Sequence, residues 1–337
     1  MILIDAIYTH QTGGKVLLDY LVSEIEKTDA EVFYLFDDRI SKDSYKIKPT
    51  NKFLFEKSTF FKRFSFYRKN KDIFSKVLCF GNIPPPIKIN AIVYTFLHQR
   101  IYLEIPRELP LKTRFSFFIK TEVVKLFKDN TDYWLVQNEN IKLKLNEKFK
   151  VDKNHILNLP FYPSVKGEKE IERNNFGFIY ISHPFPHKNH LNLIDAFCLF
   201  YDLENKGQLV LTVDRSYKEL CDYIDEKIAK GYPIKNIGFV NRDDLYQYYR
   251  GNRYLIFPSL TESFGLGIIE AIENGCDIIG ANLPYTYEVC EPSLIFDPNN
   301  VQSIKDSIIQ SIDFHNVKRS KLKVKDKIQT LIKLLTK

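Results

Sequence analysis

A strand, a polar loop and a helix follow one another between residues 254 and 275, and this unit restricts the fold more than any other stretch. Residues 254–257 form a β-prone apolar run that Pro258 ends, and residues 266–275 place apolar side chains at helical spacing up to a glycine. The hydroxyl residues before the helix are typical of N-terminal caps: Ser259, Thr261 and Ser263. The free N–H groups and positive dipole end of such a helix predict an anion-binding site beyond the strand.

The same alternation of strand, turn and helix recurs along the chain. Residues 1–8 form an apolar strand that continues through Gly13 and Gly14 into a helical pattern at 16–25. Paired glycines let the backbone approach a ligand, although many tight turns contain glycine without one. Further strands are predicted at 31–36, 76–80, 91–96, 133–136, 176–181, 209–213, 235–240 and 276–281. The alternation predicts an α/β protein with parallel sheets and ligand sites at the carboxyl ends of the strands.

Length and composition favour two domains. The 337 residues, of which 44% are hydrophobic and 14% aromatic, are sufficient for two cores, and we expect domains at 1–160 and 161–317. No apolar run approaches about 18 residues, and the N-terminal segment lacks the features of a signal peptide, so we expect a cytoplasmic chain. The five cysteines are widely spaced and mostly within apolar runs, which favours reduced thiols.

The formal net charge of +7 favours an anionic partner, such as a nucleotide diphosphate, an anionic lipid surface or a nucleic acid. Residues 52–71 combine seven basic and seven aromatic residues with a single acid. Such a segment suits a membrane, where lipid headgroups attract the charges and the rings lie at the acyl boundary. Two alternatives stay open: the rings pack into the domain, or single-stranded nucleic acid stacks on them, for which no motif is present.

Glu270 lies on the helix that begins near residue 266, and its residue type alone predicts a solvated carboxylate. Gly267, one turn earlier, leaves that carboxylate open to a ligand. The string Pro-Ser-Leu-Thr-Glu-Ser-Phe-Gly-Leu at 258–266, with a second glutamate eight positions after Glu262, resembles the Glu-x7-Glu signature of the family 4 glycosyltransferases. The resemblance implies the GT-B fold, with two Rossmann-like domains facing a cleft, nucleotide-sugar donors and retention of configuration. Gly267 departs from the signature, which usually has proline there.

The resemblance implies a role for each residue of this string. Glu262 would contact the hydroxyl groups of the donor sugar, and Glu270 would hold the ribose hydroxyls. The sugar and the diphosphate would face backbone amides, and the donor-binding set comprises Ser263, Phe264, Gly265 and Leu266.

Other positions match the family through shorter segments. Lys188 matches the lysine, and His183 stands in the arginine position, of a family segment Gly-Arg-Leu-x-x-x-Lys-Gly that neutralises the diphosphate. Gly13 and Gly14 match a Gly-Gly beside the donor phosphates, and His98 follows a strand, as a histidine near the reacting centre does in the family. A solvated lysine and structural histidines remain the alternatives. The nucleotide base would lie against Gly238, Phe239 and Val240.

We therefore expect a retaining glycosyltransferase that moves a sugar from a UDP-sugar or GDP-sugar to a glycan or lipid-linked acceptor, in bacterial surface polysaccharide synthesis. The expected catalytic residues are Glu262, His98 and Lys188. No cofactor and no metal are expected, because the chain contains no Asp-x-Asp motif. The enzyme would be cytoplasmic or peripheral at the inner face of the cell membrane through residues 52–71, and we expect no nucleic acid partner.

Two further expectations follow from the resemblance. The last helix of GT-B proteins often crosses back onto the first domain, and we expect the basic amphipathic helix at 318–337 to do so. A catalytically impaired relative with the same fold, acting as a membrane- or nucleotide-binding module, remains the alternative function, because His183 and Asp277 depart from the usual residues.

Overall fold

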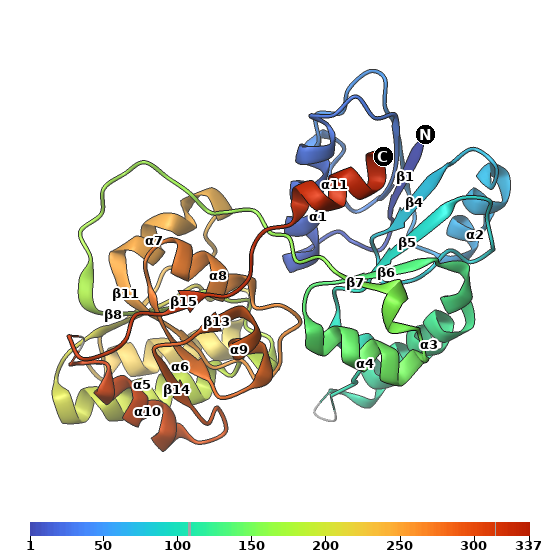
Figure 1. The fold of residues 1–337 in the computed structure, drawn as a ribbon. Coiled ribbons are helices and arrows are strands. Elements are labelled where there is room, and N and C mark those ends of the chain that lie inside the picture. Colours follow the sequence, from blue (N-terminus) through green and yellow to red (C-terminus); the bar gives the residue numbers. More distant parts are fainter. Residues whose placement is uncertain (107–108, 314) are drawn as a thin grey trace. The chain divides into compact units, whose positions relative to one another are not determined.

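The computed structural model describes residues 1–106, 109–313 and 315–337, and the chain forms two compact units (Figure 1). Unit 1 comprises Met1–Pro163 and Lys325–Lys337, and unit 2 comprises Ser164–Val324. The limits expected from the sequence were 160/161 and 317/318. None of the helices in the described ranges is both long enough and apolar enough to cross a membrane.

Unit 1 is built on a parallel seven-stranded sheet with the order β3-β2-β1-β4-β5-β6-β7. Its strands are β1 (Ile2–Ala6), β2 (Val32–Asp37), β3 (Lys52–Glu56), β4 (Lys76–Cys79), β5 (Ile92–Phe96), β6 (Tyr133–Val136) and β7 (Ile156–Asn158). Its helices are α1 (Thr12–Ile25), α2 (Phe60–Asn70), α3 (Leu111–Phe127), α4 (Glu139–Phe149) and α11 (Ile328–Thr336). Every side chain of the inner strand β1 is buried, as expected for a parallel sheet covered on both faces.

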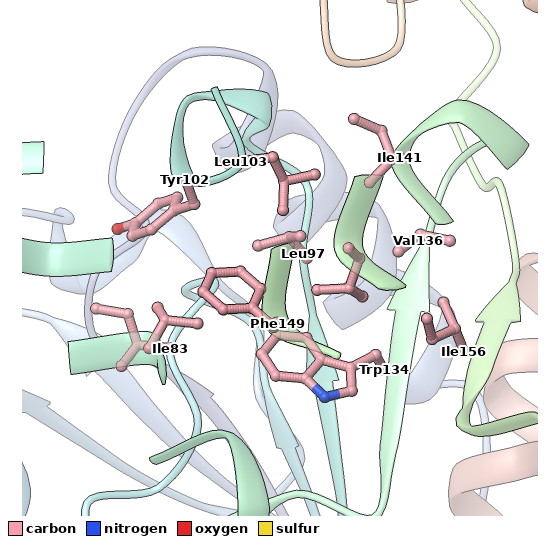
Figure 2. Packing of buried hydrophobic residues seen from close by; sticks show 11 residues of the cluster. Ile83, Leu97, Tyr102, Leu103, Trp134, Val136, Ile141, Phe149 and Ile156 are labelled. Carbon is pink, nitrogen blue, oxygen red and sulfur yellow. The ribbon is translucent and has the colours of Figure 1, made fainter. Parts of the chain in front are cut away.

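An apolar cluster packs α3 and α4 against the end of this sheet that contains β6 and β7 (Figure 2). Trp134 of β6 lies parallel to Phe149 of α4, with 6.4 Å between the ring centroids and 8° between the ring planes. Leu145 of α4 and Val124 of α3 are fully buried in the same cluster. Only Thr121 and Val124 of α3 are buried, so most of this helix faces away from the core.

Unit 2 contains a parallel six-stranded sheet with the order β10-β9-β8-β11-β12-β14. Its strands are β8 (Asn174–Tyr180), β9 (Gln208–Leu211), β10 (Ile234–Asn236), β11 (Asn252–Phe257), β12 (Asp277–Ala281) and β14 (Leu294–Phe296). Its helices are α5 (His190–Glu204), α6 (Lys218–Ala229), α7 (Leu245–Gly251), α8 (Leu266–Glu273), α9 (Pro284–Val289) and α10 (Val301–Gln310). A separate antiparallel pair joins β13 (Cys290–Glu291) to β15 (Lys321–Leu322). Because β8 and β11 are parallel neighbours, the loops that follow them lie at the same end of the sheet.

Two predicted elements are wrong in extent. The helix expected at 318–337 is limited to α11, because Lys321–Leu322 pair with β13 instead. α11 buries one apolar face and contacts α1. The strand expected at 235–240 ends at Asn236, because Gly238 takes a φ of +71° that an extended strand does not accommodate.

Candidate functional site

The loop between β11 and α8 ends at Gly265, which is the N-cap residue of α8. Gly265 has a φ of +80°, which glycine adopts without steric cost. The predicted hydroxyl caps are therefore wrong, since the cap position holds a residue without a side chain. Ser259 is buried instead, and its hydroxyl lies 3.0 Å from that of Tyr180. The N–H groups in the first turn of an α-helix have no partner within the helix and point out from its N-terminus. The anion-binding site expected at this helix therefore does not depend on hydroxyl caps.

Lys188 and Glu262 form an ion pair between two neighbouring loops of unit 2. Lys188 ends a one-turn helix, Pro186–Lys188, that follows β8, and Glu262 lies in the loop that follows β11. The two loops are joined by a hydrogen bond of 2.8 Å, which the Leu260 N–H donates to the His187 carbonyl oxygen. The side chains of the pair are 17% and 13% exposed, so solvent reaches both. The structure thus brings together two residues that the sequence placed 74 positions apart.

Two histidines lie in the loop that contains Lys188. His183 is exposed, with its ring centroid 6.0 Å from that of Phe185. His187, which the sequence did not single out as a candidate, lies nearly parallel to Phe185 at 6.0 Å. Burial lowers the pKa of His187, and the positive charge of Lys188 lowers this pKa further. In the sequence, only its position directly before Lys188 indicated that His187 could belong to the site.

The Glu270 carboxylate is buried, although Gly267 was expected to leave it open to a ligand. One oxygen of Glu270 lies 2.5 Å from an Arg242 guanidinium nitrogen, and the other accepts a hydrogen bond of 3.1 Å from the Tyr249 hydroxyl. Burial raises the pKa of Glu270, and the charge of Arg242 opposes this rise. The expected accessibility is therefore wrong, because two side chains from the segment before β11 already bind this carboxylate.

The residues expected to contact the nucleotide base form a loop and not a strand. Gly238 has a positive φ, and its N–H lies 3.3 Å from the side-chain oxygen of Asn236. Phe239 is 67% exposed, so its ring is open to stack on a flat partner. The loop follows β10, the edge strand of the sheet in unit 2.

In unit 1 the His98 ring lies next to Gly14, one of the two predicted glycines. Gly13 and Gly14 lie in the first turn of α1, and the positive φ before them belongs to Thr12. A Cβ atom on Gly14 would lie 2.9 Å from Nε2 of His98, whereas a Cβ on Gly13 would meet nothing within 4 Å. His98 is buried, which lowers its pKa to about 4 and keeps the ring neutral at pH 7. Glycine is needed at position 14 because the histidine ring occupies the space of a side chain.

A loop after β4 holds the backbone next to His98. The side-chain oxygen of Asn82 accepts hydrogen bonds from the N–H groups of His98 and Gln99, at 2.8 and 3.0 Å. Asn82 has a φ of +68°, a conformation that asparagine tolerates better than most residues. Arg63 donates to the carbonyl oxygens of the next two residues, Ile83 and Pro84. No local sequence pattern indicated these contacts, because Arg63 and Asn82 come from different elements.

Residues 163–323 match the family model described as "Glycosyl transferases group 1". This part of the chain is similar to the group 1 glycosyl transferases. O-antigen chain mannosyltransferase B of Escherichia coli is 30% identical over 138 residues, which are 40% of this chain and 36% of that protein. Alpha-monoglucosyldiacylglycerol synthase of Acholeplasma laidlawii is 27% identical over 154 residues, which are 43% of this chain and 38% of that protein. The match therefore spans little more than a third of either relative.

Solved structures resemble this chain over almost its whole length. Sucrose-phosphate synthase of Thermosynechococcus elongatus superimposes with a TM-score of 0.72 at 13% identity, covering 99% of this chain and 94% of that one. WaaG, a glycosyltransferase involved in lipopolysaccharide biosynthesis, superimposes with a TM-score of 0.69 at 11% identity, covering 100% of both chains. At such identities the likeness shows the fold, and the predicted GT-B class of two Rossmann-like domains is confirmed.

Unit 2 places complementary charges at one end of its sheet. Lys188 lies after β8, and Glu262 and the N-terminus of α8 lie after β11. A lysine charge and free helical N–H groups suit a phosphate or diphosphate, while a carboxylate suits hydroxyl groups. Among the residues that the structure describes, no three His, Cys, Asp or Glu side chains are grouped to hold a metal ion.

Proposed function

We propose that this chain is a retaining hexosyltransferase that moves a sugar from a nucleotide-sugar donor to a glycan or lipid-linked acceptor in bacterial surface polysaccharide synthesis. The observation that carries the proposal is the Lys188–Glu262 pair, which lies on the loops at the end of β8 and β11 within the family-matched segment. Relatives named for O-antigen and lipopolysaccharide synthesis support the pathway. The Anabaena HepE structure with UDP-glucose supports a UDP-sugar donor, and a GDP-sugar remains to be compared with it.

The leaving nucleoside diphosphate gains negative charge as its bond to the anomeric carbon breaks. Lys188 would supply a positive charge, and the first turn of α8 would supply N–H donors from Gly265 and Leu266. Both interactions strengthen as the charge develops, which is the requirement for catalysis by electrostatic stabilisation. Such a site needs no metal ion to neutralise the diphosphate, and we propose a metal-independent reaction without a cofactor.

Glu262 would bind the hydroxyl groups of the transferred sugar. Glu262 pairs with Lys188, so the lysine would exchange the carboxylate for the diphosphate when a donor binds. Ser263 and Phe264 would complete this part of the site, and His183 would contact the diphosphate from its exposed position.

Glu270 would accept hydrogen bonds from the ribose hydroxyls. Arg242 is the more exposed member of its pair with Glu270, with 28% against 5% of the side chain accessible, so the nucleotide would have to move Arg242. The exposed Phe239 ring, between Gly238 and Val240, would stack on the base. Ribose recognition would then require the Arg242–Glu270 ion pair to open, which the signature alone did not indicate.

Unit 1 would contribute Gly13, Gly14 and His98. A neutral imidazole donates one hydrogen bond and accepts another, so His98 would contact the substrate without a charge. Nδ1 of His98 is buried and has no hydrogen-bond partner within the described ranges. We propose that the acceptor binds unit 1 and that the enzyme is cytoplasmic and peripheral at the inner face of the membrane. The impaired relative is not favoured, since Lys188 and Glu262 are both present and paired.

A panel of UDP- and GDP-sugars tests the proposal. The purified chain should hydrolyse one donor slowly without acceptor, and Lys188→Ala should abolish this hydrolysis. Proton NMR of the transferred sugar should show the same anomeric configuration as in the donor. Inversion would exclude the retaining reaction, and an absence of hydrolysis and of thermal shift with every donor would exclude the transferase.

A further inference from the structure

Helix α3 exposes a largely apolar face. Five of its side chains are between 48% and 79% exposed: Leu111, Phe115, Phe118, Ile119 and Leu126. At 100° per residue these positions fall within a sector of about 100°. The other side of α3 buries Thr121 and Val124 in the core of unit 1. Helices that are apolar on both sides are normally buried. The exposed apolar side of α3 is therefore a candidate site for binding a protein or a membrane.

Three basic side chains, Lys112, Arg114 and Lys125, lie at the edges of this face. Helix α3 and the residue after it contain five basic residues and one acid: Lys112, Arg114, Lys120, Lys125, Lys128 and Glu122. Glu122 lies within the exposed sector, 3.8 Å from the Lys125 amine, and exposed Asp129 lies 3.4 Å from the Lys128 amine. The excess of positive charge attracts anionic lipid headgroups, while the rings and leucines suit the acyl region.

The first turn of α2 extends the apolar face. Phe60 of α2 stacks on Phe127 at the end of α3, with 6.0 Å between ring centroids. Phe61 is 80% exposed and packs edge-on against Phe60. We call the five exposed side chains of α3, together with Phe60 and Phe61, the α3 face.

Residues 52–71 contribute to this surface only in part. Arg63, Phe66 and Tyr67 are buried, so packing within unit 1 explains the second half of the segment. Phe53 and Leu54 are exposed on the edge strand β3, and Phe60 and Phe61 are exposed at the start of α2. Most of the exposed apolar side chains therefore lie on α3, and α3 is a better candidate for a membrane-binding surface than residues 52–71.

Exposure alone does not select a lipid partner, as α5 of unit 2 illustrates. Three of its leucines are exposed: Leu191, Leu199 and Leu203. Its charged residues are all acidic, namely Asp195, Asp202 and Glu204. Anionic headgroups would repel this surface, so α5 provides a control with similar apolar exposure and the opposite charge.

We infer that the α3 face docks on an anionic membrane, with α3 lying in the plane of the interface. Phe115 and Phe118 would enter the acyl boundary, and Lys112 and Lys125 would lie at the level of the lipid phosphates. The inference rests on the proposed function in one respect, because docking would bring the enzyme to a lipid-linked acceptor. Binding to lipid itself requires no catalysis, so the two can be tested apart.

Flotation of the full chain with vesicles tests the inference. The chain should float with phosphatidylglycerol vesicles and not with phosphatidylcholine vesicles, and added salt should release it. Phe115→Ser/Phe118→Ser/Leu126→Ser should lower the bound fraction at least ten-fold, whereas Leu191→Ser/Leu199→Ser/Leu203→Ser should not change it. Lys112→Glu/Lys125→Glu, which leaves the apolar residues in place, should also lower it.

Wild-type flotation of the α3 triple variant would overturn the inference, as would equal binding to both kinds of vesicle. If the triple variant does not fold, undiminished binding of Lys112→Glu/Lys125→Glu would overturn it. Self-association without flotation, abolished by the triple substitution, would assign the face to a second copy and reject membrane docking. Donor hydrolysis without vesicles separates the claims. Hydrolysis without flotation rejects docking alone, and flotation with neither hydrolysis nor a thermal shift for any donor rejects the transferase alone.

Discussion

Each unit contains an ion pair that joins distant parts of its chain, and the two pairs differ in what surrounds them. Arg63 and Asp5 of unit 1 are buried, with 2.7 Å between Nε and the carboxylate. Tyr67 also donates to Asp5, and the remaining Arg63 nitrogens bind carbonyl oxygens and the Cys79 sulfur. Lys188 and Glu262 of unit 2 are partly exposed.

The surroundings distinguish a structural pair from a pair that a ligand can open. The Arg63 side chain is buried and already donates hydrogen bonds to acceptors of unit 1. A ligand would therefore gain no interaction with Arg63 that the protein does not already make. Lys188 and Glu262 lie at the carboxyl ends of parallel strands, where α/β folds place their ligands. Solvent reaches both, so an anion can replace Glu262 at the lysine and hydroxyl groups can replace Lys188 at the carboxylate. The comparison predicts a loss of stability for one pair and a loss of activity for the other.

The largest effect is expected for Arg63→Met. This change leaves Asp5 as a buried charge without its cation and should lower the free energy of unfolding by about 3–5 kcal/mol. Urea unfolding followed by circular dichroism measures the loss. The double variant Asp5→Asn/Arg63→Met should recover part of it. A loss below about 1 kcal/mol in the single variant would remove the structural role that we assign to this pair.

Lys188→Ala should lower kcat by about 10²–10³-fold, which corresponds to about 3–4 kcal/mol of transition-state stabilisation. Its free energy of unfolding should change by less than about 1 kcal/mol, because the pair is partly exposed. Lys230→Ala removes an exposed pair with Glu226 and should change neither quantity. A large loss of stability in Lys188→Ala would make the two pairs alike and contradict the comparison.

Glu270→Ala and Glu262→Ala should separate nucleotide binding from sugar binding. Glu270→Ala should weaken the free nucleotide and the nucleotide-sugar alike, by about 1.5–3 kcal/mol for lost charged hydrogen bonds. Glu262→Ala should weaken only the ligand that carries the sugar. Calorimetry with both ligands measures the difference. Equal losses for both ligands in both variants would show that the two glutamates do not divide the donor in this way.

The smallest effect is expected for the two glycines of α1. Gly14→Ala should displace the His98 ring and destabilise unit 1 by about 1–3 kcal/mol, because the added carbon would lie 2.9 Å from Nε2. Gly13→Ala has open space and should be neutral or stabilise by about 0.4–1 kcal/mol. NMR of the His98 ring and thermal unfolding check both. Identical behaviour of the two variants would show that His98 does not depend on a glycine at position 14.

The sequence predicted much of the fold because local pattern determines where elements begin and end. The predicted limits of β6 coincide with the observed ones, Tyr133–Val136. The pattern failed at residues 319–327, where alternating lysines and apolar residues suit a helix as well as an extended segment. There β13 supplies a pairing partner that lies about 30 residues away, and no local pattern reports it.

For the candidate site, the sequence identified side chains but not what they bind. Lys188 and Glu262 were chosen by their motifs, and their contact follows from β8 and β11 being neighbours. Arg242 and Tyr249 were missed, although they bind Glu270, because a partner in another element leaves no periodic signal. Asn82 was missed at His98 for the same reason. The backbone of Asn82 has a positive φ, but the residue type alone does not indicate this conformation.

The path of the chain has a consequence for protein synthesis. Unit 1 is completed by Lys325–Lys337, whose helix α11 contacts α1, while all of unit 2 lies between these two parts in the sequence. A ribosome therefore delivers every residue of unit 2 before the last element of unit 1. During this interval α1 lacks the apolar side chains of α11 against which it packs, so the nascent chain carries an unfinished first unit for the time needed to translate about 160 residues.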